Sequence, residues 1–283
     1  MSASQFTPVT HGTRATQSAA VVTSRTAEVF ALSDQTVLKL YHAGGDDAAA
    51  REARIAQLVQ ATGVRCPEYL GRSERDGRAG LLYTRIVGPP LARWLGLRRP
   101  WRIGAAGRIL ARAHADLHTY HAPELPSLRE RLLAEVEAAA AVQSETRALA
   151  LRSIALAPDG DVLCHGDLTT DNILLAPEGP VVIDWSEAAR GDPAADVARS
   201  LMHLIVAHKY YLSAPRRPLA RAAHTLLSSA YSREYQRLQP ETAARVVYWL
   251  LPVAVARLGR GAPISQRFLL RVIARLAERS PAR

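Results

Sequence analysis

Three side chains in the middle of the chain have the types and the spacing that phosphate chemistry requires. Asp167 and Asn172 lie in the run His-Gly-Asp-Leu-Thr-Thr-Asp-Asn (165–172), and Asp184 follows in Val-Val-Ile-Asp-Trp (181–185). A carboxylate and an amide oxygen are hard ligands that suit Mg²⁺, which keeps several of its waters. A second carboxylate can accept or orient the proton of an attacking hydroxyl. The set predicts phosphoryl transfer from ATP to a hydroxyl, with Asp184 and Asn172 as metal ligands and Asp167 as catalytic base.

Short apolar runs around these residues predict the strands that position them. The runs are 161–164, 173–175 and 181–183, and a strong turn signal, Pro-Glu-Gly-Pro (177–180), separates the last two. We therefore expect a strand, a catalytic loop, a hairpin, and then the second carboxylate at the end of the last strand. The two polar loops are expected to meet at one end of a small sheet.

The segment from Cys164 to Asp196 resembles the aminoglycoside phosphotransferase and choline kinase family, the small-molecule branch of the protein-kinase-like fold. That family carries His-Gly-Asp-x-x-x-x-Asn and then Ile-Asp, where protein kinases carry His-Arg-Asp and Asp-Phe-Gly. Gly166 in place of arginine, and Trp185-Ser186 in place of Phe-Gly, favour the small-molecule branch. The resemblance implies an α+β, two-lobed protein-kinase-like fold, with a small antiparallel-sheet N-lobe and a mainly helical C-lobe. His165 and Asp196 are expected to brace the loops.

Upstream, the resemblance implies a nucleotide clamp. Lys39, in the alternating run Thr-Val-Leu-Lys-Leu-Tyr (36–41), takes the place of the kinase lysine that contacts the α- and β-phosphates of ATP. Its presence in this strand is informative, because among 36 basic residues only Lys39 and Lys209 are lysines. Glu52, on a helix expected over 46–60, is the expected ion-pair partner of Lys39. The competing partners are Asp46, Asp47 and Glu28.

The run 23–30 takes the place of the loop that covers the phosphates in kinases. Ser24 and Thr26 could offer hydroxyls or backbone amides to a phosphate. The run contains no glycine, in contrast to the glycine-rich loop of protein kinases. An ordinary hairpin turn is the competing interpretation.

A chain of 283 residues that is 48% hydrophobic can bury the core of one two-lobed enzyme. The run 80–91 passes from an apolar strand into a Gly/Pro break, which predicts an interlobe hinge. Adenine is expected to bond to the backbone around Arg85 to Val87. We accordingly expect a nucleotide-clamping N-lobe over 1–86 and a C-lobe over 87–283 that carries the catalytic loop, the metal site and the acceptor-binding helices.

His114 and His118 lie four residues apart on one face of an expected C-lobe helix. Such a pair suits a metal ion, but no further ligand cluster accompanies it in the sequence, so core or interface histidines are favoured. Residues 130–156 and 197–283 are also expected to be helical. The second region is expected to break near its prolines, Pro215, Pro218, Pro240, Pro252 and Pro263.

The net charge is +10, and the excess lies toward the C-terminus: residues 197–283 hold fifteen Lys and Arg against three acids. Because like charges repel, a pocket for a polycationic aminoglycoside needs carboxylates, so a neutral or anionic hydroxyl compound is the favoured acceptor. A local acidic patch could still form from Asp171, Glu187, Asp192 and Glu124.

Two cysteines, Cys66 and Cys164, suggest no disulfide framework, and the first twenty residues lack the pattern of a signal peptide. No apolar stretch is long enough to span a bilayer, so a cytoplasmic protein without a membrane partner is expected. Two alternative functions are a catalytically dead kinase-like scaffold and a basic nucleic-acid-binding protein. A phosphotransferase is preferred, because the kinase residues are all present and the arginines are dispersed without a recognised nucleic-acid-binding motif.

Overall fold

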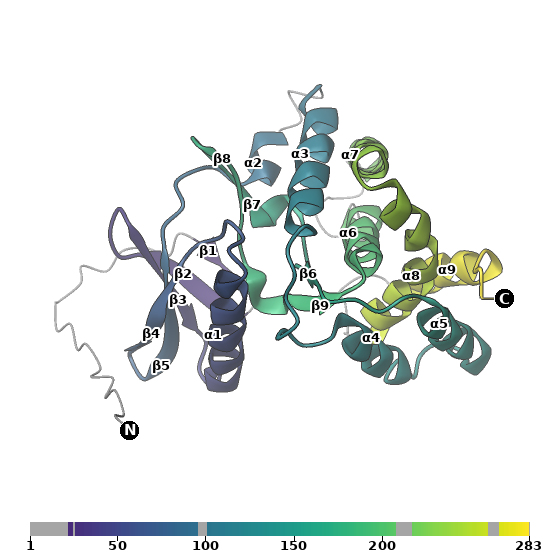
Figure 1. The fold of residues 1–283 in the computed structure, drawn as a ribbon, viewed down its shortest axis with the longest axis horizontal. Helices are drawn as coiled ribbons and strands as arrows, with labels where there is room; N and C mark the ends of the chain where they lie inside the picture. The colour runs from purple at the N-terminus through teal and green to yellow at the C-terminus, as the bar shows by residue number, and fades with distance from the viewer. Residues whose placement is uncertain (1–21, 25, 96–100, 208–216, 260–265, 283) are drawn as a thin grey trace. The chain divides into compact units, whose positions relative to one another are not determined.

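The computed structural model describes residues 22–24, 26–95, 101–207, 217–259 and 266–282 (Figure 1). The chain divides into two compact units, one formed by residues 1–49 and 70–85 and the other by residues 50–69 and 86–283. The division passes through helix α1 (Asp46–Ala61) and also falls after Arg85. The first unit holds a sheet and the second is mainly helical, which confirms the expected α+β class. The functional roles assigned to 1–86 and 87–283 stay a prediction.

The first unit holds a five-stranded sheet in the order β1-β2-β3-β5-β4. Its strands are β1 (Val22–Thr23), β2 (Ala27–Ala31), β3 (Thr36–Tyr41), β4 (Tyr69–Arg75) and β5 (Arg78–Thr84). The central strand β3 pairs antiparallel with both β2 and β5. Leu38 and Leu40 of β3 are buried, so the alternation of side chains places Lys39 on the opposite face of this strand.

The helices of the second unit pack their apolar faces into one core. They are α2 (Leu91–Leu95), α3 (Trp101–Leu117), α4 (Leu128–Glu137), α5 (Ser144–Leu156), α6 (Pro193–Ala207), α7 (Arg217–Leu238), α8 (Pro240–Gly259) and α9 (Gln266–Glu278). Helix α3 lies beside α7, and α6 lies beside α8 (Figure 1). Across the described ranges, no helix is long and apolar enough to cross a membrane.

The helix boundaries differ from expectation in two places. The region expected to be one helix over 130–156 is interrupted between α4 and α5. Pro218 and Pro240 lie in the first turns of α7 and α8, where a missing N–H costs no hydrogen bond. Pro252 was expected to break the helix, but α8 continues through it to Gly259, because Pro252 lies in a completely buried stretch whose packing overrides its local preference. Pro215, Pro263 and Lys209 lie outside the described residues.

Two separate two-stranded sheets replace the single small sheet expected in the second unit. Strand β6 (Val162–Cys164) pairs with β9 (Ala189–Gly191), and β7 (Ile173–Ala176) pairs with β8 (Gly179–Val182). The expected hairpin is confirmed, but β9 was not foreseen, because Ala-Arg-Gly has no strand pattern. Residues 165–172, which carry Asp167 and Asn172 and are called the catalytic loop below, therefore connect the two sheets.

Helices α3 and α7 approach so closely that Gly107 faces the backbone of α7. A Cβ at this position would lie 2.7 Å from Leu227 O and 2.9 Å from Tyr231 N. Real Cβ atoms do not tolerate such distances, so the glycine sets the spacing of the two helices.

We predict that Gly107→Ala and Gly104→Ala have opposite effects on stability. Alanine is the better helix former by about 1 kcal/mol, and at Gly104 the new methyl would meet only an arginine nitrogen at 3.5 Å. Gly107→Ala should instead lower the free energy of unfolding by about 1–3 kcal/mol through overpacking. Urea unfolding measures both. Stabilisation by both substitutions would contradict the close approach of α3 and α7.

Candidate active site

The catalytic loop is anchored by the carboxylate of Asp196, in the first turn of α6. Asp196 Oδ2 accepts a hydrogen bond from His165 N at 2.6 Å, and Oδ1 accepts one from Gly166 N at 2.8 Å. The Asp196 side chain is completely buried. A buried carboxylate is tolerated only when its oxygens are hydrogen bonded, so these contacts fix the start of the loop against α6.

Two histidines of α3 complete the surroundings of this carboxylate. His114 Nε2 and His118 Nε2 lie 3.1 Å and 3.4 Å from Asp196 Oδ2. The Nδ1 atoms of the same rings lie 2.6 Å from the Tyr231 hydroxyl and 2.8 Å from the Tyr235 hydroxyl. An ionised carboxylate only accepts, so each Nε2 carries a proton, and each Nδ1 shares a hydrogen bond with a tyrosine hydroxyl. Burial raises the pKa of both phenols, which keeps them protonated as donors.

The charge state of this network follows from its burial. Burial alone would raise the pKa of the Asp196 carboxyl, but the charge of His114 and the hydrogen bonds of His114 and His118 hold that pKa well below its usual range. Burial, and then the charge of His114, lower the pKa of His118 to about 4. His118 is therefore neutral at pH 7.

The histidine pair has a third potential metal ligand that the sequence did not reveal. The ligand atoms of His114, His118 and Asp196 lie within 4.8 Å of one another. The carboxylate already accepts two backbone N–H groups, and the imidazole nitrogens that face it carry protons. The cluster is therefore a hydrogen-bond network in the core, as expected for these histidines.

Helix α6 holds further backbone groups of the loop along one face. Arg199 Nε donates to Gly166 O at 2.6 Å, and Ser200 Oγ donates to Leu168 O at 2.8 Å. Residues three and four positions after Asp196 share its side of the helix, so a single helix face binds both N–H and C=O groups of the loop.

Gly166 must be glycine for two structural reasons. Its φ is +81°, a left-handed conformation that L side chains rarely adopt, and a Cβ would collide with the backbone oxygen of Glu187. This conformation accounts for the absence of the arginine that protein kinases carry here.

His165 connects the loop to the segment that carries Asp184. Its Nδ1 accepts from Asp167 N at 3.3 Å, and its Nε2 donates to Ile183 O at 3.0 Å. Burial lowers the pKa of His165, which favours the neutral ring that this arrangement requires. His165 thus braces both polar segments, as expected, and its side chain is inaccessible to a substrate.

The three predicted catalytic and metal residues are carried by this frame. Asn172 Nδ2 donates to Asp167 O at 2.9 Å, and Ile183 N donates to Asn172 O at 3.0 Å. Asp167 and Asp184 are exposed, and Asn172 is half-buried. The structure therefore connects the loop that bears Asp167 and Asn172 directly to the strand end that bears Asp184.

Asp184 has a left-handed backbone, with φ 61° and ψ 64°. This conformation costs an ordinary residue roughly 1–2 kcal/mol, although aspartate tolerates it better than most. Trp185 stabilises the turn, because its buried indole donates Nε1 to Val182 O at 3.1 Å. Such strain at an exposed carboxylate is typical of functional sites.

The predicted phosphate contacts of the first unit lie on its sheet. Lys39 Nζ is 5.9 Å from the centre of the Tyr41 ring on the same strand. The Ser24 hydroxyl closes the β1–β2 turn by donating to Ala27 O at 2.8 Å and accepting from Ala27 N at 3.1 Å. The Thr26 carbonyl accepts from His42 N at 3.0 Å. The segment is thus a hairpin turn, and phosphate contact by Ser24 or Thr26 stays a prediction.

The remaining residues that are predicted to bind the nucleotide fall in both compact units: Arg85 in the first, and Val87 and Glu52 in the second. Arg85 N donates to Gln35 O at 2.8 Å, so this amide is already used within the sheet unit, whereas Val87 is exposed. Glu52 is buried on α1, and its pairing with Lys39 stays a prediction. Among its competitors, Glu28 is bound to Arg78 at 2.7 Å.

Two of the four acids proposed for an acidic acceptor patch are engaged elsewhere. Asp192 is buried and accepts from Arg245 at 3.1 Å and from Trp249 Nε1 at 2.8 Å. Glu187 pairs with Arg131 at 3.2 Å. Asp171 and Glu124 are exposed.

His203 of α6 is a residue near Asp167 that the sequence did not single out. Burial lowers its pKa most strongly, the charge of Asp167 raises that pKa, and the charge of Arg257 on α8 lowers it. His203 and Arg257 are therefore close enough to influence the surroundings of the loop. No local sequence pattern marks His203 or Arg257, because the packing of α6 against α8 brings these two residues to the loop.

We predict that Asp196→Asn destabilises the protein by roughly 3 kcal/mol or more. The amide would place donors against the backbone N–H and imidazole N–H groups that the carboxylate now accepts. Urea unfolding at pH 7 measures the loss. Asp116→Asn, at an exposed position of α3, should change the free energy of unfolding by less than about 0.5 kcal/mol. Equal effects of the two changes would refute the anchoring role.

A second prediction concerns acidification. The pKa of His118 is about 4 in the folded protein against an ordinary value of 6.5, so between these values the unfolded chain binds a proton that the folded chain does not. His118 should therefore remove about 3 kcal/mol from the free energy of unfolding as the pH falls from 7 to 4. Urea titrations at several pH values should show a correspondingly smaller loss in His118→Gln.

The exposed His121 provides the control, as His121→Gln. If His118→Gln lost as much free energy of unfolding on acidification as the wild type and His121→Gln do, the burial of a neutral His118 would be contradicted.

The model of the phosphotransferase enzyme family matches residues 19–240. Solved structures of similar fold include a thermostable mutant of aminoglycoside phosphotransferase APH(4)-Ia in a ternary complex with ADP and hygromycin B. It is 17% identical, with a TM-score of 0.64 over 94% of this chain and 94% of that one. Another is aminoglycoside phosphotransferase APH(3'')-Id from Streptomyces rimosus, 21% identical, with a TM-score of 0.51 over 83% and 91% of the two chains.

A third is the GDP complex of wild-type aminoglycoside 2'-phosphotransferase-IIIa, 16% identical, with a TM-score of 0.52 over 92% and 91% of the two chains. No curated protein sequence matches the chain. The structural similarities confirm the expected fold, and the match to the family model, which covers well over half of the chain, confirms the expected enzyme class, a kinase with an alcohol group as acceptor. The chain belongs to the phosphotransferase enzyme family.

Proposed function

We propose that the protein transfers the γ-phosphoryl group of ATP to a hydroxyl of a small molecule, an antibiotic or a metabolite alcohol, with Asp167 as the base. The observation that carries the proposal is the shared frame of Asp167, Asn172 and Asp184, held by the Asn172–Asp167 and Ile183–Asn172 hydrogen bonds at 2.9 Å and 3.0 Å. Phosphoryl transfer is mainly positioning and charge stabilisation, and rigid placement of these groups serves both.

The donor set fits a magnesium ion. Asn172 donates its side-chain N–H to Asp167 O, which directs the amide oxygen away from this bond, and Asp184 presents an exposed carboxylate. Two hard oxygens from the protein leave room for phosphate oxygens and water, as Mg²⁺ prefers. When bound, the ion would neutralise charge on the transferring phosphate.

The other groups act through protons and charge. Asp167 is exposed while its backbone N–H is tied to His165, so the carboxylate can face a hydroxyl without losing its position. In the proposal it orients that hydroxyl and accepts its proton. Lys39, steadied by Glu52, would contact the nucleotide phosphates, with Ser24 and Thr26 beside them and the backbone around Arg85 to Val87 holding the adenine.

The acceptor we favour is neutral or anionic. The excess of arginine in 197–283 repels a polycation, and the engagement of Asp192 and Glu187 by arginines removes two acids that could attract one. An aminoglycoside, the acceptor class of the solved structures of similar fold, is the competing acceptor.

A dead kinase scaffold and a nucleic-acid-binding protein are the competing functions. The exposed positions of Asp167 and Asp184 favour an enzyme, because a carboxylate open to solvent can face a nucleotide or an acceptor hydroxyl. The left-handed backbone at Asp184 supports the enzyme as well, because backbone strain of this kind clusters at active sites.

We predict that Asp167→Asn lowers kcat by about 10²-fold or more, because the amide cannot accept the proton of the acceptor. Affinity for MgATP should change little. ADP release would be measured with ATP and with GTP against aminoglycosides, choline, homoserine, thiamine and sugar-type alcohols.

Glu178→Gln, at an exposed position of the β7–β8 turn, is the matched control and should keep wild-type turnover. Unchanged turnover in Asp167→Asn would exclude the assigned base. A wild-type protein that fails to bind MgATP at all would exclude the kinase function.

A further inference from the structure

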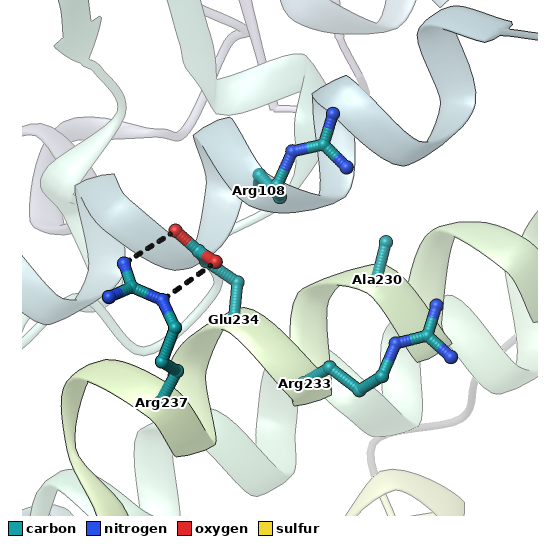
Figure 2. A pocket seen from close by; sticks show the side chains of 5 residues that line it. All are labelled: Arg108, Ala230, Arg233, Glu234 and Arg237. Carbon is teal, nitrogen blue, oxygen red and sulfur yellow. Dashed lines mark hydrogen bonds and ion pairs between the residues drawn. The ribbon is translucent and has the colours of Figure 1, made fainter.

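An open cavity of about 210 Å³ lies between α3 and α7 and is lined mainly by arginines (Figure 2). Its lining residues are Arg108, Ala230, Arg233, Glu234 and Arg237. At 3.6 residues per turn, Arg108 lies about 120° around α3 from His114, and Arg233 about 160° around α7 from Tyr231. The cavity is therefore on the outer side of the helix pair, away from the network that anchors the catalytic loop.

The one acid of the cavity is already neutralised. Glu234 accepts from Arg237 at 3.0 Å and 3.2 Å and from Arg112 at 2.9 Å. The hydrogen bonds of Arg237, and then of Arg112, hold the pKa of Glu234 at about 2. Both carboxylate oxygens are thus occupied, and this group of three side chains carries a net positive charge.

Two arginines of the cavity face no acid. Arg108 and Arg233 are exposed, and neither pairs with an acid in the described part of the chain. Figure 2 shows Arg108 on α3 and Arg233 on α7, both extending on the side of the small Ala230 and away from the Glu234–Arg237 pair. Gly107 and Ala230 are small and face one another where the two helices meet, so neither position places a long side chain in the cavity.

We propose that this cavity binds a small phosphate-bearing anion, a pyrophosphate or a phosphomonoester, between the guanidinium groups of Arg108 and Arg233. Planar guanidinium groups match the oxygens of phosphate in two-point hydrogen bonds. The volume is below the range of about 300–1,000 Å³ that holds drug-sized ligands, so it suits a ligand of one or two phosphate groups. The site is separate from the proposed kinase chemistry.

The test is calorimetric titration of the full-length protein with sodium pyrophosphate, and separately with glycerol phosphate, in EDTA at low ionic strength. Arg108→Gln/Arg233→Gln should weaken binding of the preferred anion by about tenfold or more, because two charge-assisted contacts are lost. Added salt should weaken wild-type binding, since the site is open to solvent. Tighter binding of pyrophosphate or of glycerol phosphate shows whether the cavity prefers a pyrophosphate or a phosphomonoester.

Arg152→Gln/Arg221→Gln, which removes the same charge at exposed positions outside the cavity, should keep wild-type affinity. Binding of neither anion to the wild type, or equal affinity in the two double variants, would overturn the proposal. ADP release by the cavity variant should equal that of wild type, which separates this proposal from the kinase assignment. If circular dichroism shows that this variant is unfolded, Arg233→Gln alone takes its place with the same criteria.

Discussion

The arrangement of the second unit depends on one buried negative charge. The Asp196 carboxylate receives the N–H groups of His165 and Gly166 and the Nε2 groups of two histidines. Each of these bonds joins elements that are distant in sequence: the loop after β6, helix α6 and helix α3. A carboxylate that bulk solvent does not reach needs donors from the protein, so its position is tied to those of the elements that supply them.

The same demand organises the α3–α7 interface. The two tyrosines of α7 hydrogen bond to the two histidines of α3, which requires these helices to lie close together, and Gly107 permits that approach. The arginine-lined cavity lies on the outer side of the same helix pair. The histidine–tyrosine network and the cavity thus belong to one pair of helices.

The loop and hairpin of the candidate site could be predicted from the sequence, while the contacts that support them could not. The spacing of Asp167, Asn172 and Asp184 and the Pro-Glu-Gly-Pro turn predicted the loop and hairpin, because those signals are local. The partners of His114 lie 82 and 117 residues away, at Asp196 and Tyr231, and no local pattern encodes such pairs. Strand β9 was missed because tertiary pairing imposes its conformation, and Pro252 was misread because packing overrides its local preference.

Gly166 has a consequence for how the activity is controlled. Protein kinases carry an arginine at the matching position, and cationic side chains near a catalytic loop are what a phosphorylated residue binds when modification orders an active site. The left-handed backbone and the Glu187 carbonyl exclude any side chain here, so this position supplies no cation for such a switch. In this protein the catalytic loop is held by its hydrogen bonds to Asp196 and Arg199 of α6, which form when the chain folds. A phosphorylated residue would therefore find no arginine to bind at position 166 of the loop.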